Sequence, residues 1–363
     1  MRFNRPLLFI GSLIALTACG GGGDDPASNL VAAPVPAPDP IPDPIPDPIV
    51  GDDESLASNG CTNVVIAEGI AYAACGAEIE VAQLDTLERA LFFNAADDIT
   101  IDAGAGLLFT QAGALLTTFG LSDPFAPDVL SSNNTNFSAF SGLSAANGIL
   151  VISGGAGNSD TQVYTYSDTS EPISLATDGI LAIDNTTGNP DVHVTASSDG
   201  ITAFYSQDIG AVANFAIQIA DINSSGQAVN VSQDIVLTPG GFNFSSVFVP
   251  ANFPVESEFL NDRLYIAHFA AQGVEVIDLA NNNTLLPVIP LTYEPTNIAT
   301  DGEMLFVVGV SHDTVDMIDP ATSSVVASFT PSTPFGQPVG VAASATHIAV
   351  ADRVNGLVII ARE

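Results

Sequence analysis

Apolar and polar residues alternate in a unit that recurs along the second half of the chain. Leu264–Asp278 reads LYIAHFAAQGVEVID, and 41 positions later Leu305–Asp319 reads LFVVGVSHDTVDMID without a gap. A looser copy, HIAVADRVNGLVIIA, spans His347–Ala361. Each copy contains two short apolar runs joined by a polar loop, which predicts two adjacent β-strands. Helical periodicity is almost absent, so we expect an all-β fold.

The same pattern predicts seven hairpins between Ser55 and Glu363. About 305 residues divided among seven hairpin units gives roughly 44 each, the length of a four-stranded propeller blade. We therefore expect a seven-bladed β-propeller over residues 55–363, because radial stacking buries both faces of each blade. The predicted turns are Glu68-Gly69, Gly104-Ala105-Gly106, Asn147-Gly148, Asp199-Gly200, Asn261-Asp262, Asp301-Gly302 and Ala345-Thr346.

The fifth unit predicts the strand order within a blade most clearly. Its expected strands are Val255–Leu260, Arg263–Phe269, Val274–Leu279 and Leu285–Leu291. The seventh unit stops after its third strand. We expect the segment just before Cys61 to supply the missing strand and close the ring.

Part of this pattern is similar to a known family of repeats. Asp301–Thr322 and Thr118–Pro127 resemble the YVTN- and LVIVD-type repeats of bacterial WD40-like propellers. The resemblance implies the propeller fold for residues 55–363. It implies a function only weakly, because propellers perform many unrelated functions.

The first residues have the pattern of an export signal. Arg2 and Arg5 precede the apolar run Leu7–Leu16, which is too short to span a bilayer. The sequence from Leu16 to Cys19, LTAC, resembles a bacterial lipobox. That resemblance implies a signal peptide over residues 1–18, lipidation of Cys19 and, with Gly20 next, sorting to the outer membrane. The lipid would be the only membrane anchor, with the domain facing the periplasm or the cell surface.

Residues 19–54 are expected to be a linker. Its centre repeats Pro-Asp-Pro-Ile between Pro38 and Ile49. Alternating prolines remove backbone donors and fix φ, so neither a helix nor a sheet can form there. We expect a disordered but extended stalk.

The charge balance excludes one class of partner. The chain has 41 acidic residues, six basic residues and a formal net charge of −35. Such a surface repels phosphate backbones, which argues against nucleic acid binding. The acidity suits a protein in a salty or extracellular medium, and binding of a divalent cation stays open as an alternative.

Cys61 and Cys75 flank the first predicted hairpin. If Ala67-Glu68-Gly69 is a three-residue loop, Ile66 is opposite Ile70 and the two cysteines are opposite each other. An exported protein occupies an oxidising compartment, so we expect a disulfide between them. Two buried thiols are the alternative.

The candidate binding face is the rim formed by the loops that join second and third strands, together with the connections between blades. Ionisable residues at these loops and aromatic residues in the long connection Gly240–Pro254 could meet there. The candidates are His268, Phe269, His312, Asp313, Asp352, Arg353, Phe242, Phe244 and Phe248.

Motifs typical of enzymes are absent from the sequence, including nucleophile elbows, phosphate-binding loops and HExxH. We therefore expect a non-enzymatic, lipid-anchored binding module without a cofactor, whose partner is an envelope or extracellular protein. The alternative is a metal-dependent propeller hydrolase or lactonase with its site on the central axis. Three or more carboxylates or histidines on the axis would favour that alternative.

Overall fold

Contacts between Cα atoms divide the chain into Met1–Pro44 and a larger compact unit, Ile45–Glu363. In the computed structural model, all the residues that can be described lie within the second unit. The described residues are 50–51, 60–92, 94–135, 140–146, 148–154, 160–166, 174–175, 181–182, 192–196, 201–208, 214–222, 228–229, 235–236, 256–268 and 272–362. The predicted signal peptide, Cys19 and most of the linker lie outside these residues.

The described strands form seven sheets, which we number in chain order. Sheet 1 contains β2 (Asn63–Ala67), β3 (Ile70–Cys75), β4 (Glu78–Gln83) and β5 (Arg89–Phe92). Sheet 2 contains β6 (Asp98–Asp102), β7 (Leu107–Ala112), β8 (Leu115–Gly120) and β9 (Asp128–Asn134). Sheet 3 contains β10 (Phe140–Ala146), β11 (Ile149–Gly154), β12 (Asp160–Thr165), β13 (Ser174–Leu175) and β14 (Leu181–Ala182).

The remaining sheets follow the same order. Sheet 4 contains β15 (Val192–Ala196), β16 (Ile201–Asp208), β17 (Asn214–Ile222), β18 (Ala228–Val229) and β19 (Ile235–Val236). Sheet 5 contains β20 (Glu256–Leu260), β21 (Arg263–His268), β22 (Gly273–Asp278), β23 (Thr284–Leu285) and β24 (Ile289–Pro290). Sheet 6 contains β25 (Asn297–Thr300), β26 (Leu305–Val308), β27 (Val315–Asp319), β28 (Ser324–Pro331) and the short β1 (Val50–Gly51). Sheet 7 contains β29 (Pro338–Ala343), β30 (His347–Asp352) and β31 (Gly356–Ala361).

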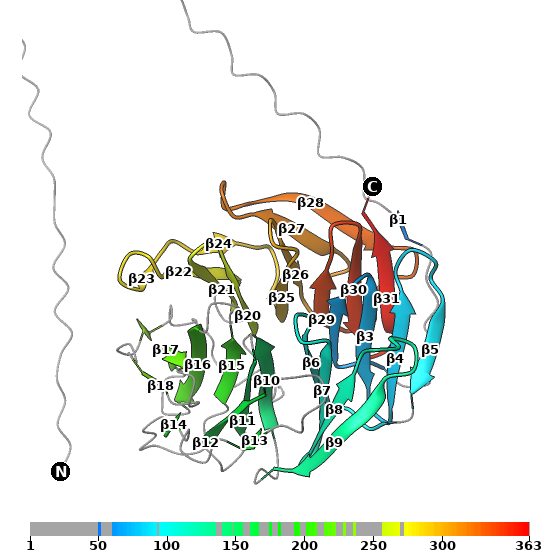
Figure 1. Cartoon of the computed structure of the whole chain (residues 1–363). Helices are drawn as coiled ribbons and strands as arrows, with labels where there is room; N and C mark the ends of the chain where they lie inside the picture. The colour runs from blue at the N-terminus through cyan, green and yellow to red at the C-terminus, as the bar shows by residue number, and fades with distance from the viewer. Residues whose placement is uncertain are drawn as a thin grey trace, which may run out of the picture. The chain divides into compact units, whose positions relative to one another are not determined.

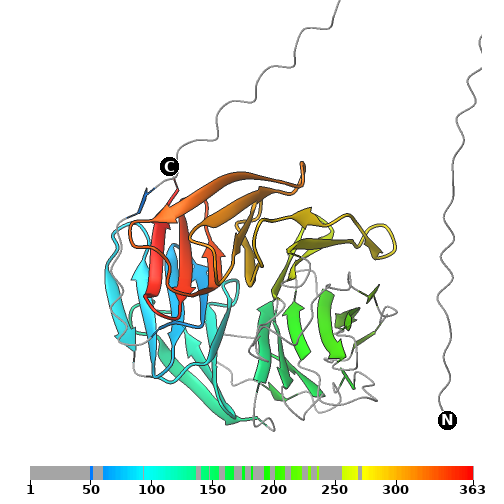
Figure 2. The same ribbon diagram turned by 180° about the vertical axis from the view of Figure 1, so that it is seen from behind.

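The seven sheets stand side by side in a ring (Figures 1 and 2). The first strand of each sheet lies beside the first strand of the next, from β2 through β6, β10, β15, β20 and β25 to β29, and β29 lies beside β2. Each first strand is therefore innermost. In the sequence, all seven predicted turns lie between the first and second strands of a sheet, although Asn147, Asp199 and Gly200 are outside the described residues.

Burial changes across each sheet in the way that this arrangement requires. The second strands are almost continuously buried, as β3 shows with all six residues inaccessible. Neighbouring sheets cover both of their faces, so both faces are apolar. The first strands β2, β6 and β20 share one pattern in which the second and fifth residues are buried and the others are partly exposed. The outermost strand β9 has no buried residue.

The first hairpin differs by one residue from the predicted register. Ala67, and not Ile66, is opposite Ile70, so the loop is the predicted two-residue turn Glu68-Gly69, and the three-residue loop from which the cysteine register was derived is wrong. Glu68 and Gly69 have φ values of 49° and 77°, as a type I′ turn requires. A glutamate rarely adopts positive φ, which is why the turn type was not evident from the residues.

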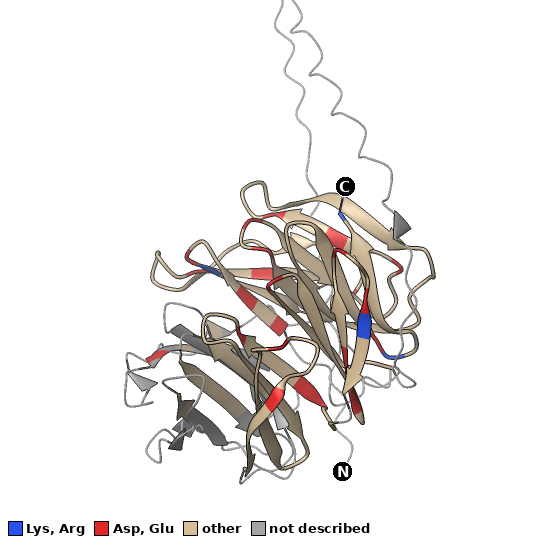
Figure 3. Ribbon diagram, turned by 45° about the vertical axis from the view of Figure 1, so that its right-hand side comes forward, with Lys and Arg blue, Asp and Glu red and all other residues tan. Residues whose placement is uncertain are grey.

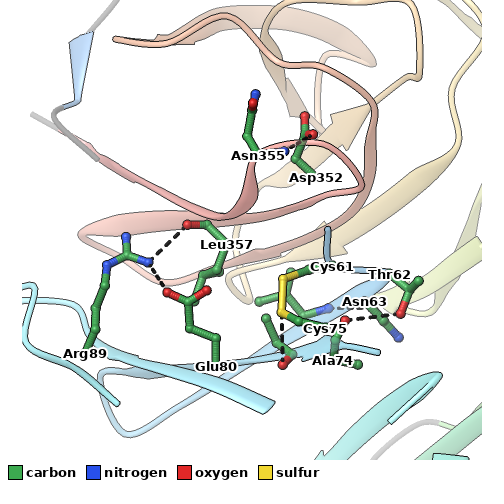
Figure 4. Close-up of a disulfide and its surroundings, with 12 residues drawn as sticks. Cys61, Thr62, Asn63, Ala74, Cys75, Glu80, Arg89, Asp352, Asn355 and Leu357 are labelled. Carbon is green, nitrogen blue, oxygen red and sulfur yellow. Dashed lines mark hydrogen bonds and ion pairs between the residues drawn. A yellow bond between two sulfur atoms is a disulfide. The ribbon is translucent and has the colours of Figure 1, made fainter. Parts of the chain in front are cut away.

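Cys61 and Cys75 are joined by a disulfide (Figure 4). Both residues are fully buried. Because Asn63 is opposite Ala74, the bond runs diagonally across the hairpin and not between opposite residues. The backbone N–H of Cys61 also donates to the carbonyl of Asp352 in sheet 7, at 2.9 Å. The disulfide thus fixes the chain where the first and last sheets meet.

Polar side chains of the innermost strands connect neighbouring sheets at three of the described junctions. Asn63 Nδ2 donates to Asp98 Oδ1 in sheet 2, at 2.6 Å. Thr100 Oγ1 accepts a bond from the N–H of Ala145 in sheet 3, at 3.3 Å. Asn297 Oδ1 accepts one from the N–H of Val341 in sheet 7, at 3.1 Å. These bonds hold neighbouring sheets in register around the ring.

The outer strands differ in two places from the sequence prediction. The fourth strand of the fifth unit is split into β23 and β24 on either side of Pro287, which cannot donate to the ladder. Val50 and Gly51, which we assigned to the linker, form β1 and pair in parallel with Thr330 and Pro331. Residues 52–59, expected to add a strand to sheet 7, lie outside the described part of the chain.

Candidate functional site

A buried acid recurs in the third strand of three sheets. The offset of 41 residues between the two closest repeats aligns Glu275 of β22 with Asp316 of β27. Glu80 occupies the same position in β4, as the strand registers show. All three are buried, and each has a different partner that carries or can accept a positive charge. A buried carboxylate is tolerated only with such a partner.

In sheet 1 the partner is Arg89, from the neighbouring strand β5. Its Nη1 lies 2.7 Å from Glu80 Oε1, and it also donates to the carbonyl of Leu357 in sheet 7, at 3.1 Å (Figure 4). Burial lowers the pKa of Arg89 to about 10, so the side chain stays charged at neutral pH. The ion pair therefore joins the first and last sheets.

In sheet 5 the partner is His268, at the end of β21. Its Nδ1 lies 3.2 Å from Glu275 Oε2, and both side chains are buried. We placed His268 on the exposed rim from the sequence. The structure places it inside the sheet, because it is still within the ladder, opposite Gly273.

In sheet 6 the partner is His312, in the loop between β26 and β27. Its ring stacks on Tyr293 with centroids 3.8 Å apart and 12° between the planes. Its Nε2 lies 2.7 Å from Thr314 Oγ1 and 3.7 Å from Asp316 Oδ2. Ser328 Oγ donates to Asp316 Oδ1 at 2.7 Å.

This cluster has the residue types of a catalytic triad but not its geometry. In a triad the histidine uses one nitrogen for the acid and the other for the nucleophile. Here Thr314 and Asp316 both approach Nε2 of His312. Burial alone would raise the pKa of Asp316, but hydrogen bonds from His312, Ser328 and Tyr293 hold it below its ordinary value. The arrangement stabilises an ionised Asp316 and does not activate a nucleophile.

Asp352 organises the loop that follows β30. Its side chain is buried, and Oδ2 accepts bonds from the N–H groups of Gly336 and Gln337 at 2.8 and 3.0 Å. Oδ1 accepts bonds from those of Val354 and Asn355 at 2.7 and 2.8 Å. All four bonds are to backbone, so this carboxylate shapes the loop.

Of the other residues predicted to lie on the rim, some are exposed in the structure and the rest are outside the described residues. Asp313 and Arg353 are exposed, as the sequence led us to expect. Phe242, Phe244, Phe248 and Phe269 lie outside the described residues, so the aromatic part of that face stays a prediction.

Three acids of the innermost strands form a second group that the sequence did not single out. Asp98, Glu256 and Glu258 are half-buried and lie on β6 and β20. Burial, and then repulsion from Asp98, raises the pKa of Glu256 to about 8; burial, and then repulsion from Glu256, raises that of Glu258 to about 8. Burial also raises the pKa of Asp98. Because β6 and β20 belong to sheets that are not neighbours, this repulsion acts across the axis of the ring.

The axial acids do not form a ready metal site. Among the residues that the structure describes, one group of three potential ligands lies within 4.8 Å of one another: Cys61, Cys75 and Glu80. Both sulfur atoms of that group are bonded to each other, so it cannot bind a metal as thiolates. Asp98, Glu256 and Glu258 are not a group of this kind, so their carboxylates would have to move closer together to bind one ion.

A pocket of about 330 Å³ lies between sheets 1 and 2. Glu68 and Tyr72 line it from the first hairpin, and Leu121 and Pro124 line it from the turn between β8 and β9. This end of the sheets carries the turns between first and second strands. It is therefore the opposite face from the rim that we predicted from the sequence.

No known protein family model matches this chain, and no curated protein matches it. The resemblance to YVTN and LVIVD repeats thus depends on the residues alone. In the structure described above, no helix is long and apolar enough to cross a membrane.

Solved structures give a clear result for the fold. The chain is similar to a chain in "Crystal Structure of Mitotic Checkpoint Complex", with a TM-score of 0.64 and 11% identity. The match covers 92% of this chain and 99% of that one. Similar folds occur in 1076 chains, so the likeness is common to many proteins. At this identity the comparison establishes a shared all-β fold and nothing about activity.

Proposed function

We propose that this chain is a lipid-anchored protein of the cell envelope whose seven-bladed β-propeller binds another protein. The seven sheets would be the blades, residues 1–18 the signal peptide, Cys19 the lipidated residue, and the proline-rich linker the stalk. The similar propeller in a multi-protein checkpoint complex supports a role in protein interaction.

One observation carries this proposal above the enzymatic alternative. The described groups best suited to chemistry are engaged in holding the fold together: His268 pairs with Glu275, His312 with Asp316, and Asp352 bonds four backbone N–H groups. The described surface also carries exposed acids and six exposed large apolar side chains, which are available for binding.

Capture from native cells tests the proposal. Full-length protein with a C-terminal tag would be crosslinked in intact cells, and the captured proteins identified by mass spectrometry. We expect the same protein to be crosslinked in stoichiometric amount by wild type and by a variant of an exposed residue outside the candidate binding face, such as Glu303→Gln. Recovery of no reproducible partner would contradict an interaction role.

A separate experiment tests lipidation of Cys19. Cys19→Ala should move the protein from the membrane fraction to the soluble fraction and abolish incorporation of labelled palmitate. Retention in the membrane by the Cys19→Ala protein would contradict the anchor but leave the binding role intact.

A metal-dependent hydrolase is the second candidate, and the axial acids Asp98, Glu256 and Glu258 are the observation that favours it. Elemental analysis of the purified protein, compared with a Glu256→Gln/Glu258→Gln variant, would test it. A stoichiometric metal that the variant loses would support this candidate. Equal metal content in both proteins would reject it.

A further inference from the structure

The pocket between sheets 1 and 2 combines apolar walls with an acidic edge. Ile70 and Tyr72 of β3 form one wall, and Leu121 and Leu130 form the other. Its volume of about 330 Å³ lies within the range of small-ligand pockets, and it is large enough to accept one large side chain.

The charge around the pocket is entirely negative. Glu68 and Asp128 line it, both exposed, and no lysine or arginine is among the lining residues. Burial, and then repulsion from Glu68 and Asp123, raises the pKa of the Tyr72 hydroxyl, so the side chain of Tyr72 stays neutral beside these acids. Glu68 and Asp128 would attract a cation to this edge of the pocket.

An exposed apolar surface continues from the pocket along β9. Leu130 is 36% exposed and Val129 is 60% exposed. These are two of the six large hydrophobic side chains that are exposed in the described part of the chain. An apolar cluster beside a pocket, edged by charge, is the usual form of an interface hot spot.

We propose that this pocket binds an extended segment of a partner protein in which a large apolar side chain stands next to lysine or arginine. The apolar side chain fills the pocket between Tyr72 and Leu121, and the base pairs with Glu68 and Asp128. This inference depends on the proposed interaction role and names the surface and the chemistry of the partner.

Short labelled peptides test this directly on the purified full-length protein. Each peptide carries a central phenylalanine or leucine flanked by arginine, by serine or by glutamate, and its affinity is measured by fluorescence anisotropy. We expect the arginine-flanked peptides to bind most tightly and the glutamate-flanked ones not to bind. Equal binding by the three sets, or no binding by the arginine set, would overturn the inference.

A matched pair of variants locates the site. Leu130→Asn should weaken binding of the arginine-flanked peptides by about tenfold, equivalent to roughly 1.4 kcal/mol. Leu115→Asn is the control, because Leu115 has a similar exposure of 39% but lies at the opposite end of the same sheet. Equal weakening by both variants would place the binding elsewhere.

A variant without the two acids separates recognition of the basic residue from recognition of the apolar side chain. Glu68→Asn with Asp128→Asn should remove the preference for arginine over serine and flatten the salt dependence of binding. Asn tolerates the positive φ of position 68, so the turn is kept. An unchanged preference would reject the acidic edge as its source.

The outcomes distinguish this inference from the proposed function. A partner captured from cells equally by wild type and by Leu130→Asn would refute the pocket while supporting an interaction module. Loss of that partner with Leu130→Asn but not with Leu115→Asn would support both.

Discussion

The acids inside the sheets and the acids around the axis have opposite environments. Glu80 and Asp316 are buried in third strands, and each has a positively charged or hydrogen-bonding partner within the fold. Glu256 and Glu258 lie on the innermost strand β20, and other acids repel their charged forms. The same residue type is thus stabilised in its charged form in one region and in its protonated form in the other. Figure 3 shows how few basic residues are available to neutralise the acids of the ring.

The difference between these two groups of acids shows where a chain with only six basic residues needs a positive charge most. An unpaired charge in the middle of a sheet has no access to water, so a partner is obligatory there. An axial acid is half-buried and can take up a proton instead. The scarce arginine is accordingly found beside Glu80, where the first and last sheets meet.

The largest expected effect is removal of that arginine. Arg89→Met leaves the buried Glu80 without its counter-charge and removes the bond to the carbonyl of Leu357. We expect a loss of about 3–5 kcal/mol in the free energy of unfolding, as for other broken buried ion pairs. Urea denaturation of the full-length protein measures it.

Two further variants serve as controls for Arg89→Met. Glu80→Leu combined with Arg89→Met should recover most of the loss, because no buried charge remains. Arg353→Met, at an exposed arginine, should change the stability by less than about 0.5 kcal/mol. A loss from Arg89→Met no greater than that of Arg353→Met would show that Glu80 does not need its partner.

Neutralising the axial acids should have the second largest effect, and it should depend on pH. The folded-state pKa of Glu256 and of Glu258 is raised to about 8. Protonation therefore favours the folded state, and this stability is present below the unfolded pKa of about 4.3 and lost as the pH rises through 8. Glu256→Gln with Glu258→Gln should raise stability least at pH 5 and most at pH 9, where the gain should be on the order of 2 kcal/mol.

The measurement is urea denaturation of wild type and of the double variant at pH 5, 7 and 9. Asp313→Asn, which removes an exposed acid, controls for the general effect of net charge. Similar gains from Asp313→Asn and from the double variant at pH 9 would show that the axial acids are ordinary surface carboxylates.

The fold was predictable because its signals are local. Paired Gly, Asn and Asp residues mark the turns, and alternation of apolar residues marks the strands, so the turn at Asn261-Asp262 and the strand β21 were placed correctly to within a residue. The turn at Glu68-Gly69 was placed correctly too, but the register derived for the two cysteines was wrong by one residue, because the two-residue loop depends on positive φ at Glu68, which its residue type does not predict.

The site was much less predictable, since burial of a polar residue depends on what lies beside it in the ring. His268 and Asp352 appeared to be rim residues because they end their strands, but both are enclosed by neighbouring segments. A better signal was present in the acids of the runs VEVID and VDMID. An acid inside an apolar strand at the same position of two repeats, Glu275 and Asp316, indicates a buried charge that needs a partner.

The smallest expected effect comes from a change at Asp316, the buried acid that is stabilised mainly by hydrogen bonds. His312→Phe keeps the stacking on Tyr293 but removes the nitrogen that approaches Asp316. The pKa of Asp316 is held below its ordinary value, so its bonds stabilise the fold above about pH 4, and this contribution is lost as the pH falls lower. We expect His312→Phe to cost about 1 kcal/mol at pH 7, the usual value of one such bond, and less at pH 3.5. Urea denaturation at the two pH values, with Ser328→Ala as a second probe of the same carboxylate, measures this. A cost that is identical at both pH values would mean that His312 contributes by packing alone, and that Asp316 is stabilised by Ser328 without a cation, unlike Glu80.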